Sequence, residues 1–381
     1  MPFPLISEYI EAIKSAEDNF EELTNLRAVV GDDGQPVMTS GNFAVVFKMQ
    51  DIETGKYYAV KCFTKDQEGR ENAYHQIVEE LKNVESPYLI SIRYIDKELF
   101  VDSNQTTETE FPVLLMDWVE GKTLDKYLRD NLNKKKTMEK FVSKFYLLAK
   151  WLIAQPFAHG DLKPDNILVN KDGNLVLIDY DGMYVPAMNG QKSREVGSPD
   201  FCHPRRSEGG FDEHVDDFSI LSILLSLCVL LVKPNFLKKY GAEDRLLFSK
   251  NDYVAIHNSI LFQKIPSIIE TSTNYKLLFG KACKDSDFQL KTRSLTPVDK
   301  LIKAMAIQKV AVTRTVNDVE LANLGIKTDI DPVGQYIWKT SNNPIVQYNL
   351  DKSSSHKFLL EKEKREKATK WQAALLLVNS N

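Results

Sequence analysis

His159-Gly160-Asp161-Leu162-Lys163-Pro164-Asp165-Asn166 is the stretch of this chain that decides its fold. Two short runs of mostly branched apolar residues follow it, at 167–169 and 175–178, with a turn sequence at 170–174 between them. This pattern predicts a β-hairpin, and Asp179 stands directly at its end. The motif therefore consists of a polar loop, a hairpin and a further acidic residue in a fixed order.

These residue types suit the transfer of a phosphoryl group. The reaction needs an aspartate that accepts or orients the proton of the attacking hydroxyl, and it needs an asparagine and a second aspartate that hold magnesium. We assign the first role to Asp161 and the second to Asn166 and Asp179. Lys163, two residues beyond Asp161, can reach the γ-phosphate and neutralise developing charge, so it is the other predicted catalytic residue.

The loop and the strand after it resemble the catalytic loop and metal-binding strand of the eukaryotic-type Ser/Thr protein kinase superfamily. The resemblance covers about residues 36 to 320. It implies an α+β, two-lobed fold with an antiparallel-sheet N-lobe and a mainly helical C-lobe. It also implies binding of ATP with Mg²⁺ and transfer of the γ-phosphoryl group to Ser or Thr hydroxyls of a protein, the kinase itself included.

The order of the predicted elements agrees with this fold. Runs rich in β-branched and aromatic residues predict an antiparallel sheet, with strands at 45–49, 57–63, 89–95 and 113–118 and a helix at 72–84 between them. Helical patterns then follow at 124–131, 138–154, 218–232 and 297–307. The sheet comes first and the helices second.

Four segments follow from this order. We expect an N-terminal helical extension at 1–35, the N-lobe at 36–120, the C-lobe at 121–322 and a C-terminal extension at 323–381. Within the first, apolar residues recur at helical spacing and predict one amphipathic helix from Ser7 to Leu26 that covers a core; they are Ile10, Ile13, Phe20 and Leu23. The last segment ends in a charged run at 361–367 and a predicted helix at 371–378.

Three further stretches resemble the nucleotide site of the family. Thr39–Val46 resembles the Gly-rich loop, although two of the three glycines are replaced by Thr39 and Ala44. Tyr58-Ala59-Val60-Lys61 matches the strand whose lysine contacts the α- and β-phosphates, and Leu114–Gly121 resembles the hinge. The resemblance implies nucleotide contacts at Gly41, Val46, Ala59, Lys61, Met116, Asp117, Val119 and Leu168.

The family pairs the strand lysine with a glutamate on the following helix. Here the expected position falls near Ile77, so Glu71, Glu79 or Glu80 could serve only if the helix is shifted. The sequence leaves the partner of Lys61 open.

Gly197–Arg205 resembles the substrate-docking end of the activation segment, with two departures. Arg205 stands where the family has a glutamate that pairs with a late arginine, for which Arg314 is the candidate here. Gly160 stands where regulated kinases have an arginine that binds a phosphorylated activation loop. We therefore expect activity that does not require phosphate on Ser193 or Ser198.

Leu177–Pro186 contains Asp179-Tyr180-Asp181 in place of the usual Asp-Phe-Gly. With Trp118–Gly121 and Gly241–Phe248, it resembles a bacterial group of kinase-like proteins that often carry a helix-hairpin-helix DNA-binding domain, although no such pattern is present in the tail. This resemblance suggests a cognate phosphatase as an opposing partner.

Two alternatives remain open. His159-Gly160-Asp161 is also typical of aminoglycoside and choline kinases, but these lack a peptide-docking segment such as Gly197–Arg205. A pseudokinase that acts as an ATP-binding scaffold is favoured by Ala44, the missing helix glutamate, Asp181 and Arg205. It is opposed by the joint presence of Lys61, Asp161, Asn166 and Asp179.

The composition adds limits on location and partners. A net charge of −4 gives no indication of nucleic-acid binding. The N-terminus does not resemble a secretory signal, and the longest apolar run, Ile220–Val232, is shorter than the roughly 20 residues that cross a bilayer, so we expect a buried helix and no membrane partner. The four cysteines are spread singly, which predicts reduced thiols in a cytoplasmic protein: Cys62, Cys202, Cys228 and Cys283.

Overall fold

The structure is a computed structural model that describes residues 2–206, 210–265, 273–284, 289, 328–330 and 336–338. The chain divides into two compact units, which we describe separately. The first comprises Met1–Leu124, Phe157–Gly197 and Ser207–Val215, and the second comprises Asp125–Pro156, Ser198–Arg206 and the chain from Asp216. Every predicted catalytic, metal-binding and nucleotide-binding residue lies in the first unit.

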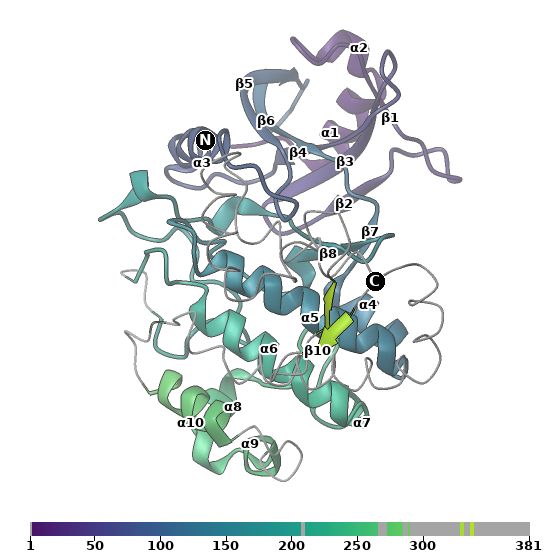
Figure 1. Cartoon of the computed structure of the whole chain (residues 1–381). Helices are drawn as coiled ribbons and strands as arrows, with labels where there is room; N and C mark the ends of the chain where they lie inside the picture. Colours follow the sequence, from purple (N-terminus) through teal and green to yellow (C-terminus); the bar gives the residue numbers. More distant parts are fainter. Residues whose placement is uncertain are drawn as a thin grey trace. The chain divides into compact units, whose positions relative to one another are not determined.

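A six-stranded antiparallel sheet forms much of the first unit (Figure 1). Its strands are β1 (Leu26–Ala28), β2 (Met38–Ser40), β3 (Ala44–Asp51), β4 (Tyr57–Phe63), β5 (Ile92–Phe100) and β6 (Glu110–Asp117). They run in the order β1-β3-β4-β6-β5, with β2 also paired to β3. The four predicted strands are confirmed, although β5 begins three residues later than predicted.

The register gives the two faces of this sheet different roles. Val46 lies opposite Lys61, and Ala59 lies opposite Met116 on one side and Lys48 on the other. Directly opposed residues point to the same face, so the predicted nucleotide contacts Val46, Ala59, Lys61 and Met116 share one face. The alternate residues on these strands face the other way.

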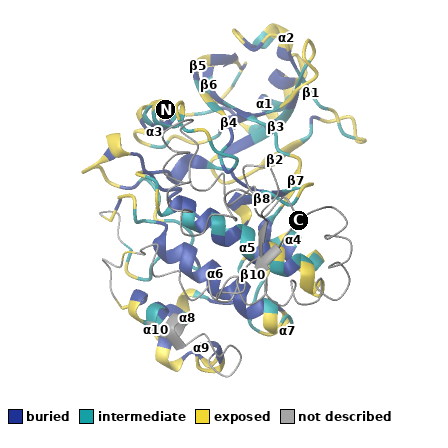
Figure 2. Cartoon of the chain, viewed as in Figure 1, coloured by how far each residue is buried: buried dark blue, intermediate teal, exposed yellow. Residues whose placement is uncertain are grey.

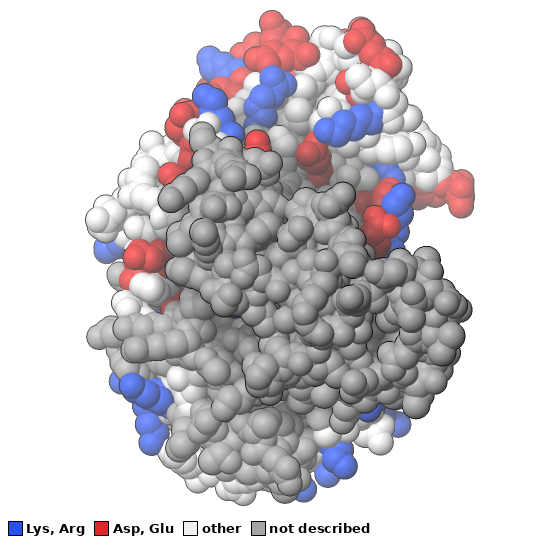
Figure 3. Space-filling model, in the orientation of Figure 1, with Lys and Arg blue, Asp and Glu red and all other residues white. Residues whose placement is uncertain are grey.

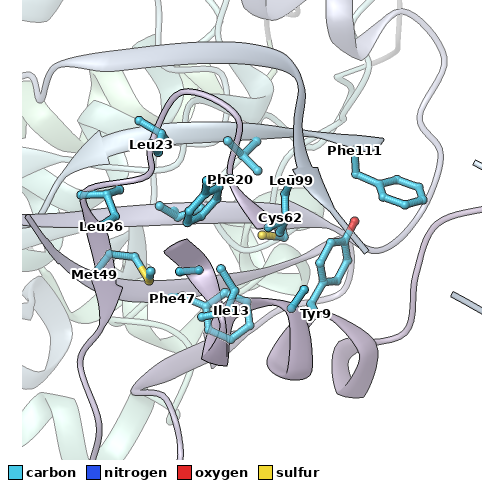
Figure 4. Close-up of a cluster of buried hydrophobic side chains, with 14 of the residues drawn as sticks. Tyr9, Ile13, Phe20, Leu23, Leu26, Phe47, Met49, Cys62, Leu99 and Phe111 are labelled. Atoms are coloured by element: carbon cyan, nitrogen blue, oxygen red, sulfur yellow. The ribbon is translucent and has the colours of Figure 1, made fainter. Parts of the chain in front are cut away.

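The other face is covered by the N-terminal part of the chain (Figure 4). Helix α1 (Ile6–Lys14) contributes Tyr9 and Ile13 to a buried apolar cluster with sheet residues such as Phe47 and Cys62. Burial of this kind stabilises by about 25 cal/mol for each Å² of apolar surface removed from water. The prediction of a core-covering segment is confirmed.

The prediction of one continuous helix from Ser7 to Leu26 was wrong. Helix α1 ends at Lys14, and a short α2 (Ala16–Asn19) follows after Ser15, whose backbone φ of −114° and ψ of 47° lie outside the helical range. Phe20 and Leu23 pack in the same buried cluster from the non-helical chain that leads to β1. Residues at helical spacing can therefore reach one core although the helix has ended.

Two buried polar groups fasten this segment to the sheet. The hydroxyl of Tyr9 donates to the backbone oxygen of Phe63 at 2.7 Å. Glu98, on β5, is 1 % exposed and accepts backbone N–H groups of Glu22 and Leu23, the latter at 2.8 Å. Burial raises the pKa of Glu98 although these donors favour its charged form. The contacts satisfy polar groups that would be costly to bury unpaired.

Helix α3 (Arg70–Leu81) and a three-stranded sheet complete the regular elements of the first unit. Tyr74 and Ile77 lie on the buried face of α3, and the helix ends three residues before the predicted end at residue 84. The small sheet joins β7 (Gly121–Thr123), β8 (Ile167–Asn170) and β9 (Leu175–Leu177), which confirms the predicted hairpin. Single 3-10 turns occur at Pro164–Asn166, Tyr180–Gly182 and Pro186–Met188.

The second unit is mainly helical. Its helices are α4 (Leu124–Asn131), α5 (Lys135–Leu152), α6 (Asp217–Val232), α7 (Asn235–Tyr240), α8 (Lys250–Val254), α9 (Ile260–Lys264) and α10 (Thr273–Ala282), with a 3-10 turn at Ile256–Asn258. Strands β10 (Thr328–Ile330) and β11 (Tyr336–Trp338) pair antiparallel. The predicted helices at 124–131, 138–154 and 218–232 are confirmed. Those at 297–307 and 371–378, and the charged run at 361–367, lie outside the described residues.

Helix α6 is buried along almost its whole length (Figure 2). Its apolar residues surround the helix, as expected of a helix enclosed by protein. Among the described residues, no helix is both long enough and apolar enough to span a bilayer.

Candidate active site

The hairpin of β8 and β9 brings Asn166 and Asp179 to its open end. Ile167 lies opposite Leu177, and the backbone N–H of Ile178 donates to the oxygen of Asn166 at 3.0 Å. Asp179 follows with a φ of 65°, a left-handed conformation that few non-glycine residues adopt. Such conformations are often found at functional sites. The two predicted magnesium ligands therefore lie at the same end of the hairpin, Asn166 just before β8 and Asp179 just after β9.

Asp161 is held by the two other polar residues of its loop. Lys163 Nζ donates to Asp161 Oδ2 at 2.6 Å, and Asn166 Nδ2 donates to the backbone oxygen of Asp161 at 2.8 Å and to Oδ2 at 3.2 Å. Burial would lower the pKa of Lys163, but the carboxylate of Asp161 raises it above its ordinary value. Lys163 is therefore an ammonium in contact with the predicted base.

Lys61 is a buried cation between two carboxylates. Its side chain is 8 % exposed, and Nζ lies 2.7 Å from Asp179 Oδ1 and 2.8 Å from Asp181 Oδ1. Burial alone would lower the pKa of Lys61, but the charges of Asp179 and Asp181 raise it. Burial alone would raise the pKa of Asp179, but the positive charge of Lys61 holds this pKa below its usual value. The three groups form a charged cluster.

The glutamates of α3 take no part in this cluster. Within the part of the chain that the structure describes, the carboxylates that bond Lys61 are Asp179 and Asp181. Glu71 and Glu79 are exposed, and Glu79 lies 3.7 Å from Lys82. Sequence reasoning noticed Asp181 as a departure from Asp-Phe-Gly but missed it as a partner of Lys61. The signal was an extra acid two residues after Asp179, in a chain whose helix has no glutamate at the expected position.

Gly160 and Gly182 pack backbone against backbone. A Cβ added to Gly160 would lie 1.7 Å from the oxygen of Gly182, and Gly160 has a φ of 82°. No side chain fits there, so the arginine of regulated kinases is excluded sterically. The loop 159–166 and the Asp179–Gly182 segment thus touch along their main chains.

His159 and Tyr180 lie next to this contact in the chain and are both buried. His159 is buried and hydrogen-bonded through Nε2 to the oxygen of Ile178 at 2.8 Å. The hydroxyl of Tyr180 donates to the oxygen of Leu177 and accepts the N–H of Ile90, both at 3.0 Å. The bonds to Leu177 and Ile178 end on the backbone of β9 and its extension, so they fix the strand that leads to Asp179.

Most of the predicted nucleotide residues lie on strands of the six-stranded sheet or directly beside them, and Leu168 lies on β8. Gly41 forms the turn of the β2–β3 hairpin, where its N–H donates to the oxygen of Ala44 at 2.8 Å, so the stretch that resembles a Gly-rich loop is an antiparallel hairpin. Met116 and Asp117 end β6, and Lys56 Nζ bonds Asp117 Oδ1 at 2.6 Å. The remaining positions are buried or half-buried: Val46, Ala59, Val119 and Leu168.

The stretch that resembles the end of an activation segment is fixed within the second unit. The hydroxyl of Ser219 on α6 donates to the backbone oxygen of Phe201 at 2.7 Å. The hydroxyl of Tyr253 on α8 donates to the backbone oxygen of Asp200 at 2.6 Å. The ring of His203 bonds the oxygen of Ala282 at 2.7 Å. Arg314, the candidate for the late arginine, lies outside the described residues.

Comparison with known proteins agrees with this geometry. A family model for the protein kinase domain matches residues 35–289, and the chain belongs to that family. It is similar to the serine/threonine-protein kinase AtPK1/AtPK6 of Arabidopsis thaliana, with 26 % identity over 58 % of the chain and 46 % of the relative. It is also similar to the cAMP-dependent protein kinase catalytic subunit of Dictyostelium discoideum, with 24 % identity over 60 % of the chain and 32 % of the relative.

A third relative matches a shorter part of the chain but with a higher sequence identity. The serine/threonine-protein kinase CBK1 of Pneumocystis carinii is 32 % identical over 38 % of the chain and 27 % of its own length. The chain thus spans less than half the length of these curated relatives. The expected fold class is confirmed, because the chain has a kinase-family match, an antiparallel sheet in one unit and a helical second unit.

Proposed function

We propose that the chain is a serine/threonine protein kinase that transfers the γ-phosphoryl group of ATP, with Mg²⁺, to a hydroxyl of a protein. The observation that carries this proposal is the cluster of Lys61 with Asp179, beside an Asp161 that Lys163 and Asn166 hold in place. Family membership and the names of the relatives support it.

The loop residues supply positioning and electrostatics. Asp161 accepts or orients the proton of the incoming hydroxyl, and Lys163, bonded to it, compensates charge that develops on the transferred group. Because Asn166 binds both the backbone and the carboxylate of Asp161, the base has little freedom to turn away. Phosphoryl transfer asks for this kind of fixed geometry more than for covalent participation.

The donor set fits a magnesium ion. Asn166 uses its amide nitrogen on Asp161, which leaves its amide oxygen for a cation, and Asp179 uses one carboxylate oxygen on Lys61 and is 43 % exposed. Oxygen ligands of this kind suit Mg²⁺. Held by Asn166 and Asp179, Mg²⁺ would neutralise charge on the phosphates of ATP. Lys61 is the proposed positive charge of the protein that contacts the phosphates.

One face of the six-stranded sheet suits the nucleotide itself. Val46, Ala59 and Met116 share that face with Lys61, so apolar contacts for a base lie on the same side as a cation for phosphates. Backbone groups of Asp117 and Val119, the turn at Gly41 and the side chain of Leu168 are the remaining proposed contacts.

The two alternatives lack such support. A scaffold without catalysis gives no reason for two hydrogen-bonded groups of these residue types, Asp161 with Asn166 and Lys61 with Asp179. The named relatives are protein kinases, none of them a kinase of small molecules.

Transfer of labelled γ-phosphate from ATP tests the proposal. We expect wild-type protein with Mg²⁺ to label itself or a generic basic protein, and Lys61→Ala and Asp161→Asn to leave both unlabelled. Chelation of the metal should stop the reaction as well. Absence of label in wild type, under conditions where a thermal-shift titration shows that Mg²⁺ and ATP bind, would contradict a protein kinase.

Phosphorylation of the activation segment is expected to be unnecessary. Gly160 leaves no room for the arginine that would bind such a phosphate, and Ser193 is buried with its hydroxyl bonded to the oxygen of Glu195. The variant Ser193→Ala/Ser198→Ala should keep most of the wild-type initial rate, and so should wild type treated with a phosphatase and checked by intact mass. A double variant that loses turnover while it still binds ATP would overturn this expectation.

The finer assignments are also proposals. The Asp179-Tyr180-Asp181-Gly182 stretch supports the bacterial kinase-like group, and with it a cognate phosphatase. In the upper part of Figure 3, acidic and basic side chains are intermixed over the described residues, which suits a protein substrate better than nucleic acid. The four cysteines are buried and form no disulfide within the described residues, which supports a cytoplasmic location. For the segments, we propose the boundaries 1–35, 36–120, 121–322 and 323–381.

A further inference from the structure

Asp181 has contacts that the roles proposed above do not use. Its side chain is 11 % exposed, and its Oδ1 accepts from Lys61 Nζ at 2.8 Å. The hydroxyl of Tyr74, on α3, donates to the same oxygen. A single carboxylate oxygen thus connects the lysine of β4 with the helix.

Tyr74 is held so that its hydroxyl points to this carboxylate. The residue is fully buried, and its ring stacks on Tyr94 with centroids 5.5 Å apart and planes at 9°. Phe63 packs against it, with ring centroids at 5.9 Å. Because the aromatic neighbours fix the ring, the hydroxyl has a defined position at little further entropic cost.

The backbone of Asp181 is held as well. The guanidinium of Arg194 donates to its main-chain oxygen. The residue is therefore fixed at both ends, by Arg194 at the main chain and by Lys61 and Tyr74 at the side chain.

Asp179 and Asp181 differ in what they can do for Lys61. Asp179 is 43 % exposed and is the proposed magnesium ligand, whereas Asp181 is enclosed and faces the lysine and the tyrosine. If Asp179 shared its charge with a metal, Asp181 would be the carboxylate committed to Lys61 alone. A buried lysine without such a partner would be costly.

We propose that Asp181 positions Lys61 for the phosphates of ATP, in place of the helix glutamate that other kinases use, and that Tyr74 couples α3 to this pair. The inference rests on the proposed function. Asp181 is a positioning residue, since it acts through Lys61.

Calorimetric titration with ATP and Mg²⁺ tests the proposal directly. Asp181→Asn should raise the dissociation constant at least about tenfold, because a buried charge loses its partner. Tyr74→Phe keeps the ring and should weaken binding by a smaller factor, about three- to tenfold. Asp181→Asn should also need more Mg²⁺ for half-maximal turnover, since Lys61 then has Asp179 alone. Asp181→Glu, which keeps the charge, should recover part of the affinity.

Glu71→Gln, Glu79→Gln and Glu80→Gln are the matched controls, and we expect wild-type affinity from each. The thermal midpoint of each unliganded variant separates a positioning effect from loss of the fold. Wild-type affinity in both Asp181→Asn and Tyr74→Phe, or a large loss in a glutamate variant instead, would overturn the inference while transfer by wild type upholds the proposed function. Wild type that binds no ATP with Mg²⁺ would overturn both.

Discussion

Replacing Asp161 with asparagine is expected to lower turnover about 10²- to 10⁴-fold, the usual contribution of a positioned general base. Asparagine has nearly the same shape, so Lys163 and Asn166 should stay in place around it. The dissociation constant for ATP with Mg²⁺ should change little, because the proposed ligands of the metal and the phosphates are other residues. Initial rates and calorimetric titration of the same preparation would measure the two quantities.

Asp172→Asn is the matched control for this change. Asp172 is exposed in the turn between β8 and β9, so the same loss of one carboxylate there should leave turnover intact. Normal turnover in Asp161→Asn would refute the role of Asp161. A loss of binding equal to the loss of turnover would instead assign Asp161 to the nucleotide site.

The second large effect is expected for Gly160→Ala. The added methyl would lie 1.7 Å from the oxygen of Gly182, and both partners in this contact are main chain, which cannot move aside without displacing Asp161 or Asp179. We expect a loss of more than about 4 kcal/mol in the free energy of unfolding, which is exceptional for a single substitution. Urea denaturation followed by circular dichroism would measure it.

Gly190→Ala separates the clash from backbone strain. Gly190 has a φ of 80°, close to that of Gly160, but a Cβ there meets nothing within 4 Å. Its variant should lose only about 1–2 kcal/mol, the cost of a left-handed conformation. Equal losses of unfolding free energy in the two variants would show that the clash with Gly182 adds nothing to the cost of backbone strain.

Local patterns explain which parts of the fold could be predicted. Strands β3 and β4 and the β8–β9 hairpin are read from residues that are neighbours in sequence, and so is the apolar helix α6. The break at Ser15 could not be predicted in this way, because Phe20 and Leu23 enter the same core whether the chain is helical or extended. The spacing of apolar residues therefore indicates which residues are buried more directly than it indicates the conformation of the backbone.

In the candidate site, too, contacts between residues that are far apart in the sequence could not be predicted from local patterns. The loop 159–166 and Asp179 could be predicted because they form one motif around one hairpin. The partner of Lys61 could not, since Asp181 lies 120 positions away and reaches the lysine through the tertiary fold. For Gly160, the sequence showed that an arginine was missing, but only the packing against Gly182 explains why no side chain is tolerated.

The helices before the sheet have a practical consequence for anyone who wishes to express the catalytic region alone. The family match begins at residue 35, yet β1 and the buried residues of α1 lie before that point. A chain trimmed to residue 35 would expose the apolar side of the sheet, including Phe47 and Cys62, and would lose β1 from its pairing with β3. Exposed apolar patches and open strand edges promote aggregation. A piece of this chain that is meant to fold alone should therefore begin near its first helix, well ahead of the residue at which the family match begins.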